Sequence, residues 1–434
     1  MRGSRLSQTD FLTWRLQRNP ILRPTIVAVL LLDAAPDRDR LAAAIERGTR
    51  AVPEFRGLLV GGRAGLRPPR WVPDRAFDLA WHVRCDEQAR PVELTSVLEF
   101  AGVEAMTAFD PGRPLWRARL LASRGGGRAA LVLTVHHCLT DGVGGIRMLA
   151  TMCAEGRAGT APAPPGERRH NPAPSSAAPA RPLRSVRGGA ATVGSLARLV
   201  RPAVTTLSPV MTERGVGRAL AVLDIPADRL RHSAHAAGCT MNDAFLTAVL
   251  LGLGRYHLGH GASVDRLRVT MPISLRGADD PLGGNRISLA RFVVPLNIAD
   301  PTALMRAVDT VVGAQRNEPA IPFSGAVAAV LSRVPVPLIS GMLEHIDFVA
   351  SDVPGSPLPQ YLAGARIERL YAFSPTLGAS FNVTLTTHAG TCCIGLNADT
   401  AAVPDVRTLS DCVAGGFDAV LSGAVPAPGT EGPG

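Results

Sequence analysis

A stretch rich in proline, alanine and arginine interrupts the middle of this 434-residue chain, from Gly156 to Arg218. Its first part, TAPAPPGERRHNPAPSSAAPARP, has the composition of an extended linker. Its second part, GSLARLVRPAVTTLSPVM, has weak helical periodicity that two prolines interrupt. A chain of this length exceeds what one hydrophobic core usually holds. The interruption therefore predicts two globular halves, 1–155 and 219–424, joined by a basic crossover over 156–218 and followed by a flexible tail over 425–434.

The positive charge of the chain is concentrated in the same linker. All 46 basic residues are arginines, because the sequence contains no lysine, and the formal net charge is +10. Residues 156–218 hold ten arginines against Glu167 and Glu213, which is +8 of that total. Two readings stay open: a solvated hinge, or a basic patch that holds the protein on an anionic membrane or lipid-droplet surface or binds CoA phosphates. The sequence contains no zinc-finger spacing and no aromatic–basic RNA motif, so a nucleic-acid partner is not expected.

Cysteines and apolar runs indicate the compartment. The seven cysteines are odd in number and irregularly spaced, and no secretory signal is apparent, which is typical of reduced thiols in the cytoplasm. The most apolar short runs, Thr25–Leu32 and Ala244–Gly254, are shorter than the about 20 residues that span a bilayer. The sequence therefore predicts a cytoplasmic protein that is soluble or bound peripherally to a membrane or lipid droplet.

The first half alternates strands and helices. A strand is expected over residues 22–33 and a helix over 37–52. Residues 114–123 and 128–137 flank an RGGG turn, which predicts an antiparallel pair with two histidines at the end of its second strand. A helix is expected to follow over 144–155.

The second half repeats this mixed pattern, so we expect an α+β fold made of two sandwich halves. The helix over 241–257 is apolar nearly all round and should be buried. His388 lies at an expected hairpin tip, where it should be exposed. The other expected elements are strands over 221–225, 267–275, 286–298, 346–353 and 365–373, a hairpin over 380–399, and helices over 227–238 and 404–423.

The segment HHCLTDG, residues 136–142, carries the strongest chemical signal. A general base needs a fixed ring and an open face, and a strand end followed by a glycine-rich turn supplies both. The N–H groups that open the next helix can stabilise a negative oxygen. Two other readings stay open, namely metal ligands and ordinary core histidines. A shared metal ion is disfavoured because neighbouring strand side chains point to opposite faces, and the sequence has no HExxH motif.

HHCLTDGVGG resembles the HHxxxDG signature of the CoA-dependent acyltransferase superfamily. This superfamily includes chloramphenicol acetyltransferase, the condensation domains of peptide synthetases, and the wax ester synthase/diacylglycerol acyltransferase family. No DFGWG-like segment is present, which argues against the first two branches. Four segments, in order along nearly the whole chain, resemble motifs of the third: LSQTDFL its LSPxDxxFL start, Pro114-Leu115-Trp116 its PLW motif, Asn242-Asp243 its ND motif, and SDVPGSPLPQYLAGARI its SNVPGP segment.

The resemblance implies two chloramphenicol-acetyltransferase-like halves with a substrate tunnel between them. It implies that His137 deprotonates the hydroxyl of the acceptor, whose oxygen attacks the acyl thioester without an acyl-enzyme. His136 and Gly142 are expected to shape the site. Asp141 is expected to be structural, pointing away from the base and pairing with an arginine of the second half, for which Arg276 in VTMPISLRG is the candidate.

Six further residues are candidates for the tunnel wall. Three of them have an equally simple structural reading: Trp116 as a core anchor, Asn242 as a helix cap, and Asn285 as a turn residue in LGGNRIS. The six are Pro114, Leu115, Trp116, Asn242, Asp243 and Asn285.

The reaction that the resemblance implies is transfer of a fatty acyl group from acyl-CoA to a long-chain alcohol or diacylglycerol, as in wax ester or triacylglycerol synthesis. Acyl-CoA would be a co-substrate, and no cofactor or metal is expected. Two alternatives stay open: an acyltransferase for a specialised natural-product or carrier-bound acceptor, and a catalytically silent homologue that binds acyl-CoA or lipid. Asp352 stands where the family usually has asparagine, and NPILRPTIVAV replaces a PMHVG-like segment, so chain length and acceptor stay open.

Overall fold

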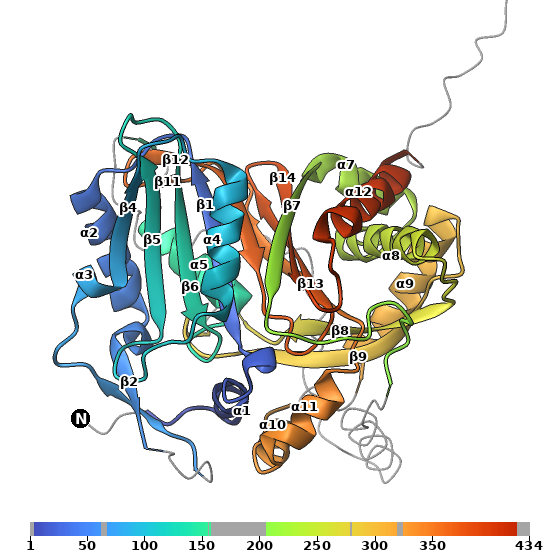
Figure 1. Ribbon diagram of the computed structural model, residues 1–434, viewed down its shortest axis with the longest axis horizontal. Coiled ribbons are helices and arrows are strands. Elements are labelled where there is room, and N and C mark those ends of the chain that lie inside the picture. The colour runs from blue at the N-terminus through green and yellow to red at the C-terminus, as the bar shows by residue number, and fades with distance from the viewer. Residues whose placement is uncertain are drawn as a thin grey trace, which may run out of the picture.

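The computed structural model describes residues 4–61, 67–154, 156–157, 205–277, 280–318 and 324–422. These residues form two six-stranded sheets that stand side by side, and a two-stranded ribbon (Figure 1). The first sheet contains β1 Thr25–Leu32, β4 Val83–Gln88, β5 Trp116–Ser123, β6 Ala129–His136, β11 Tyr361–Leu362 and β12 Ala365–Phe373. The second contains β7 Arg218–Pro226, β8 Arg266–Ser274, β9 Ile287–Pro295, β10 Phe348–Ser356, β13 Phe381–His388 and β14 Thr391–Asp399, and the ribbon is β2 Gly57–Val60 with β3 Arg70–Pro73.

Helices cover both sheets and close the lower edge of the molecule (Figure 1). The predicted α+β fold with two sheet-containing halves is confirmed. The helices of the first half are α1 Gln8–Leu16, α2 Arg38–Ala51, α3 Leu79–His82, α4 Leu94–Met106 and α5 Gly142–Met152. Those of the second half are α7 Ala227–Ala236, α8 Met241–Gly259, α9 Pro301–Arg316, α10 Ser324–Leu331, α11 Val336–Leu343 and α12 Val406–Ser422.

The two sheets do not divide the chain cleanly. The first sheet has the order β11–β12–β1–β6–β5–β4, and the second β7–β14–β13–β10–β8–β9. β12 lies in the second half of the sequence but pairs antiparallel with β1. β1 reads TIVAVLLL and is apolar along both faces, so it is stable in the interior of a sheet with a neighbour on each edge, here β6 and β12. β11 and β12, which lie within the predicted second half 219–424, therefore complete the sheet of the first half.

The linker prediction falls mostly outside the described residues, because 155 and 158–204 are not among them, and neither is the predicted tail over 425–434. The described end of the linker packs on the second half. Asp347 accepts hydrogen bonds from the N–H groups of Leu207 and Ser208, both at 3.0 Å. The chain therefore returns from the crossover close to the start of β10.

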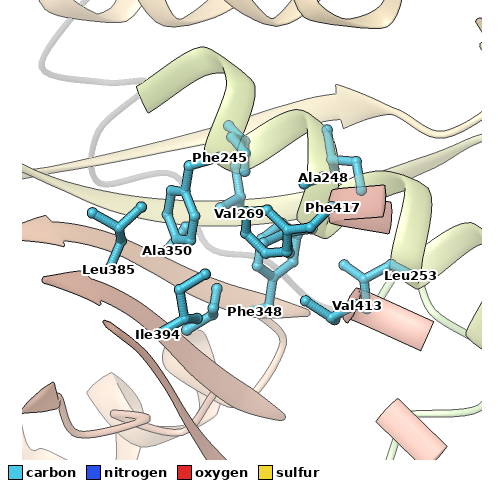
Figure 2. Close-up of a cluster of buried hydrophobic side chains, with 14 of the residues drawn as sticks. Phe245, Ala248, Leu253, Val269, Phe348, Ala350, Leu385, Ile394, Val413 and Phe417 are labelled. Carbon is cyan, nitrogen blue, oxygen red and sulfur yellow. The ribbon is translucent and has the colours of Figure 1, made fainter. Parts of the chain in front are cut away.

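The core of the second half is built around the predicted buried helix, α8. Thr240 caps it with a capping box, since its hydroxyl accepts from the N–H of Asp243 while the Asp243 carboxylate accepts from the N–H of Thr240. Figure 2 shows side chains of α8, of α12 and of strands in the second sheet meeting in one buried cluster. The two helices approach closely at Gly252, where a Cβ would lie 2.5 Å from the Cα of Val413.

The expected hairpin over 380–399 forms as β13 and β14, turning at Ala389 and Gly390, both with positive φ. His388 is nevertheless buried, with 1% of its surface exposed, so the prediction of an exposed tip is wrong. The reason is tertiary: a ring nitrogen of His388 lies 2.9 Å from the carbonyl oxygen of Ile367 in β12, so the first sheet covers the end of the hairpin.

No single described helix is long and apolar enough to cross a membrane. Two pairs of neighbouring helices have the length and apolar composition of a membrane span only when each pair is taken together. Both pairs are sharply bent: α7 with α8 by 95°, and α10 with α11 by 119°. Within the first pair, α8 belongs to the buried core, whereas α10 and α11 lie at the lower edge beside α1 (Figure 1).

Candidate active site

A cavity of about 270 Å³ lies between the two halves. It opens where β8 and β10 diverge, since these strands pair only at Phe348–Val269 and Val349–Thr270. The first half contributes α1, the end of β6 and the start of α5, and the second contributes β8, β9, β10, α10 and α11. Most of the wall is apolar, which suits a ligand with a hydrocarbon chain.

His137 lines this cavity directly after β6. Its main chain is held on both sides: the N–H donates to the carbonyl of Pro24 at 2.8 Å, and the carbonyl accepts from Asn285 Nδ2 at 2.6 Å. The side chain is only partly exposed, and its Nδ1 is buried without a hydrogen-bond partner among the described residues. The ring therefore meets the cavity through the edge that carries Nε2, a position suited to taking a proton from a bound hydroxyl.

His136 points to the opposite side of the strand and is 1% exposed. Its Nδ1 accepts from the N–H of Cys138 at 3.1 Å, and Phe109 packs edge-on against the ring at a centroid distance of 5.9 Å. Burial and the neighbouring His137 lower the pKa of His136 to about 3, so this ring is neutral. His136 supports the strand end from behind and does not reach the cavity wall.

Asp141 and Arg276 form the predicted ion pair between the two halves. Arg276 Nη2 lies 2.7 Å from Asp141 Oδ2, and the two side chains are 0% and 2% exposed. The Asp141 carboxylate also accepts from the N–H groups of Gly144, at 2.8 Å, and Arg286, at 2.9 Å. It therefore caps α5 and joins the halves at once, and these bonds turn the carboxylate away from His137.

Asn285 has a role that the sequence did not reveal. Asn285 is a candidate for the tunnel wall, but it does not line this cavity and lies behind it. Its Nδ2 donates both to the His137 carbonyl and to Asp10 Oδ1, each at 2.6 Å. The Asn285 N–H donates to the same oxygen at 3.0 Å, and the neighbouring Gly284 N–H donates to the Leu139 carbonyl at 2.8 Å. A turn of the second half thus clamps the loop that carries His137.

Asp10 is the functional residue that sequence reasoning missed. It lies in the first turn of α1, where the Ser7 hydroxyl donates to its Oδ2 at 2.6 Å, and it is 6% exposed. Burial raises its pKa, and the hydrogen bonds from Ser7 and Asn285 oppose that rise. The only signal in the sequence was the aspartate of LSQTDFL, whose partner lies 275 positions away.

The start of α5 supplies N–H groups beside His137. Gly142 and Val143 line the cavity, and they precede the first bond within the helix, which runs from the Gly145 N–H to the Asp141 carbonyl at 2.8 Å. Such N–H groups have no partner inside the helix and point along the positive end of its dipole. They are placed to stabilise a negative oxygen formed close to His137.

Replacing Gly142 with alanine is expected to disturb this position. The added Cβ would lie 2.8 Å from Val353 Cγ2 and 3.2 Å from Cγ1, so either the Val353 side chain or the start of α5 must shift. Overpacking of this kind costs roughly 1–3 kcal/mol in the free energy of unfolding, measured by chemical denaturation.

The matched control is Gly145→Ala in the same helix, where the nearest atom is 3.9 Å away and little change is expected. Adding Val353→Ala to Gly142→Ala should restore most of the lost stability. Equal effects of the two glycine substitutions would show that the contact with Val353 is not the cause.

Asp352, which stands where the resemblance leads us to expect asparagine, lies in the cavity wall. It lies on β10 beside Leu385 of β13, and its neighbours Ser351 and Val353 line the same cavity. Burial raises its pKa to about 6, and Arg316 opposes that rise only in part. Its carboxyl makes no hydrogen bond or ion pair within the described residues, so it is available to a polar group of a ligand.

Asp352→Asn is expected to remove a pH-dependent step in stability. The folded protein holds this proton more tightly than the unfolded chain, so its contribution is greatest below pH 4 and falls as pH rises from about 4 to about 6. The difference in free energy of unfolding between variant and wild type should therefore grow over that interval, by at most about 3 kcal/mol. Denaturation at pH 4.5 and pH 8 measures it, and a difference that does not change with pH would contradict the raised pKa.

The PLW candidates lie away from the cavity wall. Leu115 and Trp116 are 5% and 2% exposed and belong to the core of the first half. The Trp116 indole donates to the carbonyl of Phe55 at 2.7 Å, and its ring stacks on His82 at 4.5 Å. Pro114 precedes them and its carbonyl accepts from the N–H of Trp116 at 2.9 Å. The core-anchor reading of Trp116 holds, because its ring is buried in the core of the first half beside Phe55.

The ND candidates also do not line the cavity. Asp243 is used in the capping box of α8, and Asn242 is 8% exposed with its Nδ2 unpartnered among the described residues. None of the six tunnel candidates, Pro114, Leu115, Trp116, Asn242, Asp243 and Asn285, lines this cavity. Trp116, Asp243 and Asn285 instead have structural contacts: Trp116 in the core, Asp243 at the start of α8, and Asn285 behind His137.

Comparison with known proteins places this geometry in a family. Residues 6–245 match the wax ester synthase/diacylglycerol acyltransferase catalytic domain, and residues 283–420 match the C-terminal domain of that family. The two matches contain His137 and Asn285 respectively, the residues joined by a hydrogen bond behind the cavity wall.

Full-length relatives agree with these matches. A Mycobacterium tuberculosis protein named as a candidate diacylglycerol O-acyltransferase is 32% identical over 453 residues, covering 96% of this chain and 91% of its own. A Mycobacterium bovis protein of the same name is 28% identical over 460 residues, covering 94% and 89%.

Solved structures show the same fold. The wax ester synthase/diacylglycerol acyltransferase of Marinobacter aquaeolei VT8 matches with a TM-score of 0.65 at 21% identity, covering 97% of this chain and all of its own. The first condensation domain of the calcium-dependent antibiotic synthetase matches with a TM-score of 0.65 at 16% identity, covering 98% and 96%. Since both domain matches together span most of the chain, in the order expected from its motifs, the protein belongs to the wax ester synthase/diacylglycerol acyltransferase family.

Proposed function

We propose that the protein transfers a fatty acyl group from acyl-CoA to the hydroxyl of a long-chain alcohol or diacylglycerol. The observation that carries the proposal is the position of His137, whose ring lines an apolar cavity next to the N–H groups that begin α5. Membership of the family and the names of the Mycobacterium tuberculosis and Marinobacter relatives support it.

The chemistry needs one base and one oxyanion site, because a thioester is already activated. His137 Nε2 takes the proton of the acceptor hydroxyl as its oxygen forms a bond to the thioester carbonyl carbon. The N–H groups of Gly142 and Val143 receive the negative oxygen of the tetrahedral intermediate. Its collapse breaks the carbon–sulfur bond, and the thiolate of CoA leaves with the proton from His137. The imidazole ends as it began, and no acyl-enzyme and no further cofactor are required.

The cavity wall favours a lipophilic acceptor. α1, α10 and α11 contribute apolar residues, among them Leu12, Leu331, Ile339 and Met342. Binding of a hydrocarbon chain here buries apolar surface at roughly 25 cal/mol per Å² and holds the hydroxyl beside the base. We further propose that the protein works at a membrane or lipid-droplet surface, where such acceptors are concentrated.

Release of CoA tests the proposed function. Purified protein is incubated with palmitoyl-CoA and either hexadecanol, diacylglycerol or no acceptor, free thiol is measured with a chromogenic disulfide, and esters are identified by mass spectrometry. We expect release that depends on the acceptor and a product of the matching mass. Release equal in all three reactions indicates hydrolysis, and no release with any acceptor, including a mixed alcohol pool, indicates a silent homologue; either result contradicts the proposal.

A further inference from the structure

α10 and α11 form a bent pair at the lower edge of the molecule, below the two sheets and beside α1 (Figure 1). One side of this pair belongs to the site. α10 lines the cavity with Val327, Ala328 and Leu331, and α11 lines it with Ile339, Met342 and Leu343. The pair is therefore the part of the wall that separates the cavity from solvent at this edge.

The remaining surface of the pair is exposed and apolar. Val330 on α10 is 63% exposed and Leu338 on α11 is 62% exposed. The other exposed residues of the two helices are small or apolar: Gly325, Ala326, Pro337 and Gly341. Exposed apolar side chains scattered singly are normal, but here they share two adjacent helices that carry no charged residue of their own.

Two exposed arginines lie at this surface, and Glu344, directly after α11, is partly buried and accepts a hydrogen bond from the Ser340 hydroxyl. Arg333 is exposed in the turn between the helices, and Arg18 is exposed just after α1. Arg18 lines a groove with Pro335 and Pro337 of the same corner. Residues 325–343 contain no aspartate or glutamate. An apolar face with a basic rim is the composition of an element that lies in the interface of an anionic bilayer.

Arg15 fixes the corner to the rest of the molecule. It is 7% exposed, and its guanidinium donates to the carbonyl oxygens of Ser332 and Val334, the latter at 3.1 Å. Because α1 also carries Asp10, which holds Asn285 and so the loop of His137, the corner is connected rigidly to the catalytic loop. A surface docked through α10 and α11 would thus lie at a constant position relative to the base.

A sharp bend excludes a simple crossing of the bilayer. α10 and α11 have eight residues each and meet at 119°, so neither can span the about 30 Å of hydrocarbon. Short apolar helices of this kind rest within the headgroup region of one leaflet. The pair itself, one helix or about 10 Å thick, would lie between that leaflet and the cavity.

We propose that the exposed face of α10 and α11, with Arg18 and Arg333 at its rim, docks on an anionic lipid surface and delivers the lipid acceptor from that surface to the cavity behind it. The proposal rests on the proposed function for the acceptor, but the docking itself does not depend on catalysis. It assigns the membrane contact to a folded element next to the site rather than to the central linker.

Vesicle flotation tests the docking. The full-length protein is mixed with vesicles of phosphatidylcholine, alone or with about one-fifth phosphatidylglycerol, and the bound fraction is measured. We expect the double variant Val330→Asp/Leu338→Asp to lower the partition coefficient on the anionic vesicles by roughly tenfold or more. Arg18→Gln/Arg333→Gln should lower it by about fivefold for each arginine and remove part of the preference for the anionic vesicles.

Matched controls come from equally exposed residues on other helices. Val103 on α4 is 67% exposed and Leu258 on α8 is 68% exposed, and neither lies near the pair. The variant Val103→Asp/Leu258→Asp adds the same charge and should bind vesicles like the wild type. All variants should also release CoA from acyl-CoA and a water-soluble alcohol at rates within about twofold of the wild type, since Val330 and Leu338 are not in the cavity wall.

Different results separate the two proposals. Vesicle binding that is unchanged in Val330→Asp/Leu338→Asp, or lost equally in the control variant, overturns the docking even if CoA is released. Binding lost only in Val330→Asp/Leu338→Asp, in a protein that releases no CoA with any alcohol, keeps the docking and overturns the proposed function. Light scattering gives a third possible result. If the wild type is dimeric, the Val330→Asp/Leu338→Asp variant is monomeric and neither binds vesicles, a second copy of the chain covers this face. That result also overturns the docking.

Discussion

Replacing His137 with alanine is expected to lower the rate of acyl transfer by roughly 10²–10⁴-fold, the usual contribution of a general base. Its nearest neighbours in sequence cannot replace it: the Asp141 carboxylate is used by Arg276, Gly144 and Arg286, and His136 faces away. Acceptor deprotonation should then depend on water. The measurement is the rate of CoA release with saturating acyl-CoA and acceptor.

The same variant should keep its fold. The His137 side chain makes no hydrogen bond within the described residues, and the bonds that hold the loop come from its main chain, to Pro24 and Asn285. Alanine preserves both. The melting temperature should therefore stay within a few degrees of the wild type. A variant that still transfers acyl groups at the wild-type rate would exclude His137 as the base. If His137→Ala unfolds, its loss of activity says nothing about catalysis. His137→Gln, with a side chain of similar volume, then serves as the test in a folded protein.

Replacing Asp141 with alanine is expected to lower the free energy of unfolding by about 3–5 kcal/mol. The Arg276 side chain is 0% exposed and would remain buried without its counter-ion. The N–H groups of Gly144 and Arg286 would also lose their acceptor. Few single changes at this site remove so many interactions, so we expect this to be the largest effect on stability. Chemical denaturation measures it.

A double-variant cycle separates the structural role of Asp141 from a catalytic one. Arg276→Met should be destabilising alone, and Asp141→Ala/Arg276→Met should be more stable than the sum of the single changes predicts, because no charge is left buried. The double variant should still be less stable than the wild type, because the carbonyl oxygens of Pro281 and Gly284 lose the hydrogen bonds that Arg276 donates to them. Unchanged stability with a large fall in turnover would instead show that Asp141 acts on the reaction.

The docking face of α10 and α11 has no distinctive sequence signal. The basic linker has a charge of +8, whereas α10 and α11 carry no charged residue and only Arg333 lies in the turn that joins them. Their function as a wall is visible only when Leu331 and Met342 are found in the same cavity as His137. An apolar segment can be core, cavity wall or exposed face, and composition is the same for all three.

The tunnel-wall candidates show a related ambiguity. The motifs Pro114-Leu115-Trp116 and Asn242-Asp243 indicate the family but do not show what each side chain contacts. In the structure the Trp116 indole donates to the Phe55 carbonyl, and Asp243 completes a capping box. Both are requirements of packing and helix formation, and neither residue contacts the cavity.

By itself, the sequence determined the local frame of the site. A strand that ends at His136, a carboxylate that caps the next helix, and glycines at its start follow from bonds among residues only a few positions apart, and these patterns are readable along the chain. Tertiary structure alone decided that Asp10 and Asn285 hold the His137 carbonyl, that β12 completes the first sheet, and that His388 is buried. These contacts join residues tens to hundreds of positions apart, where packing of whole elements chooses the partner and local periodicity carries no record of it.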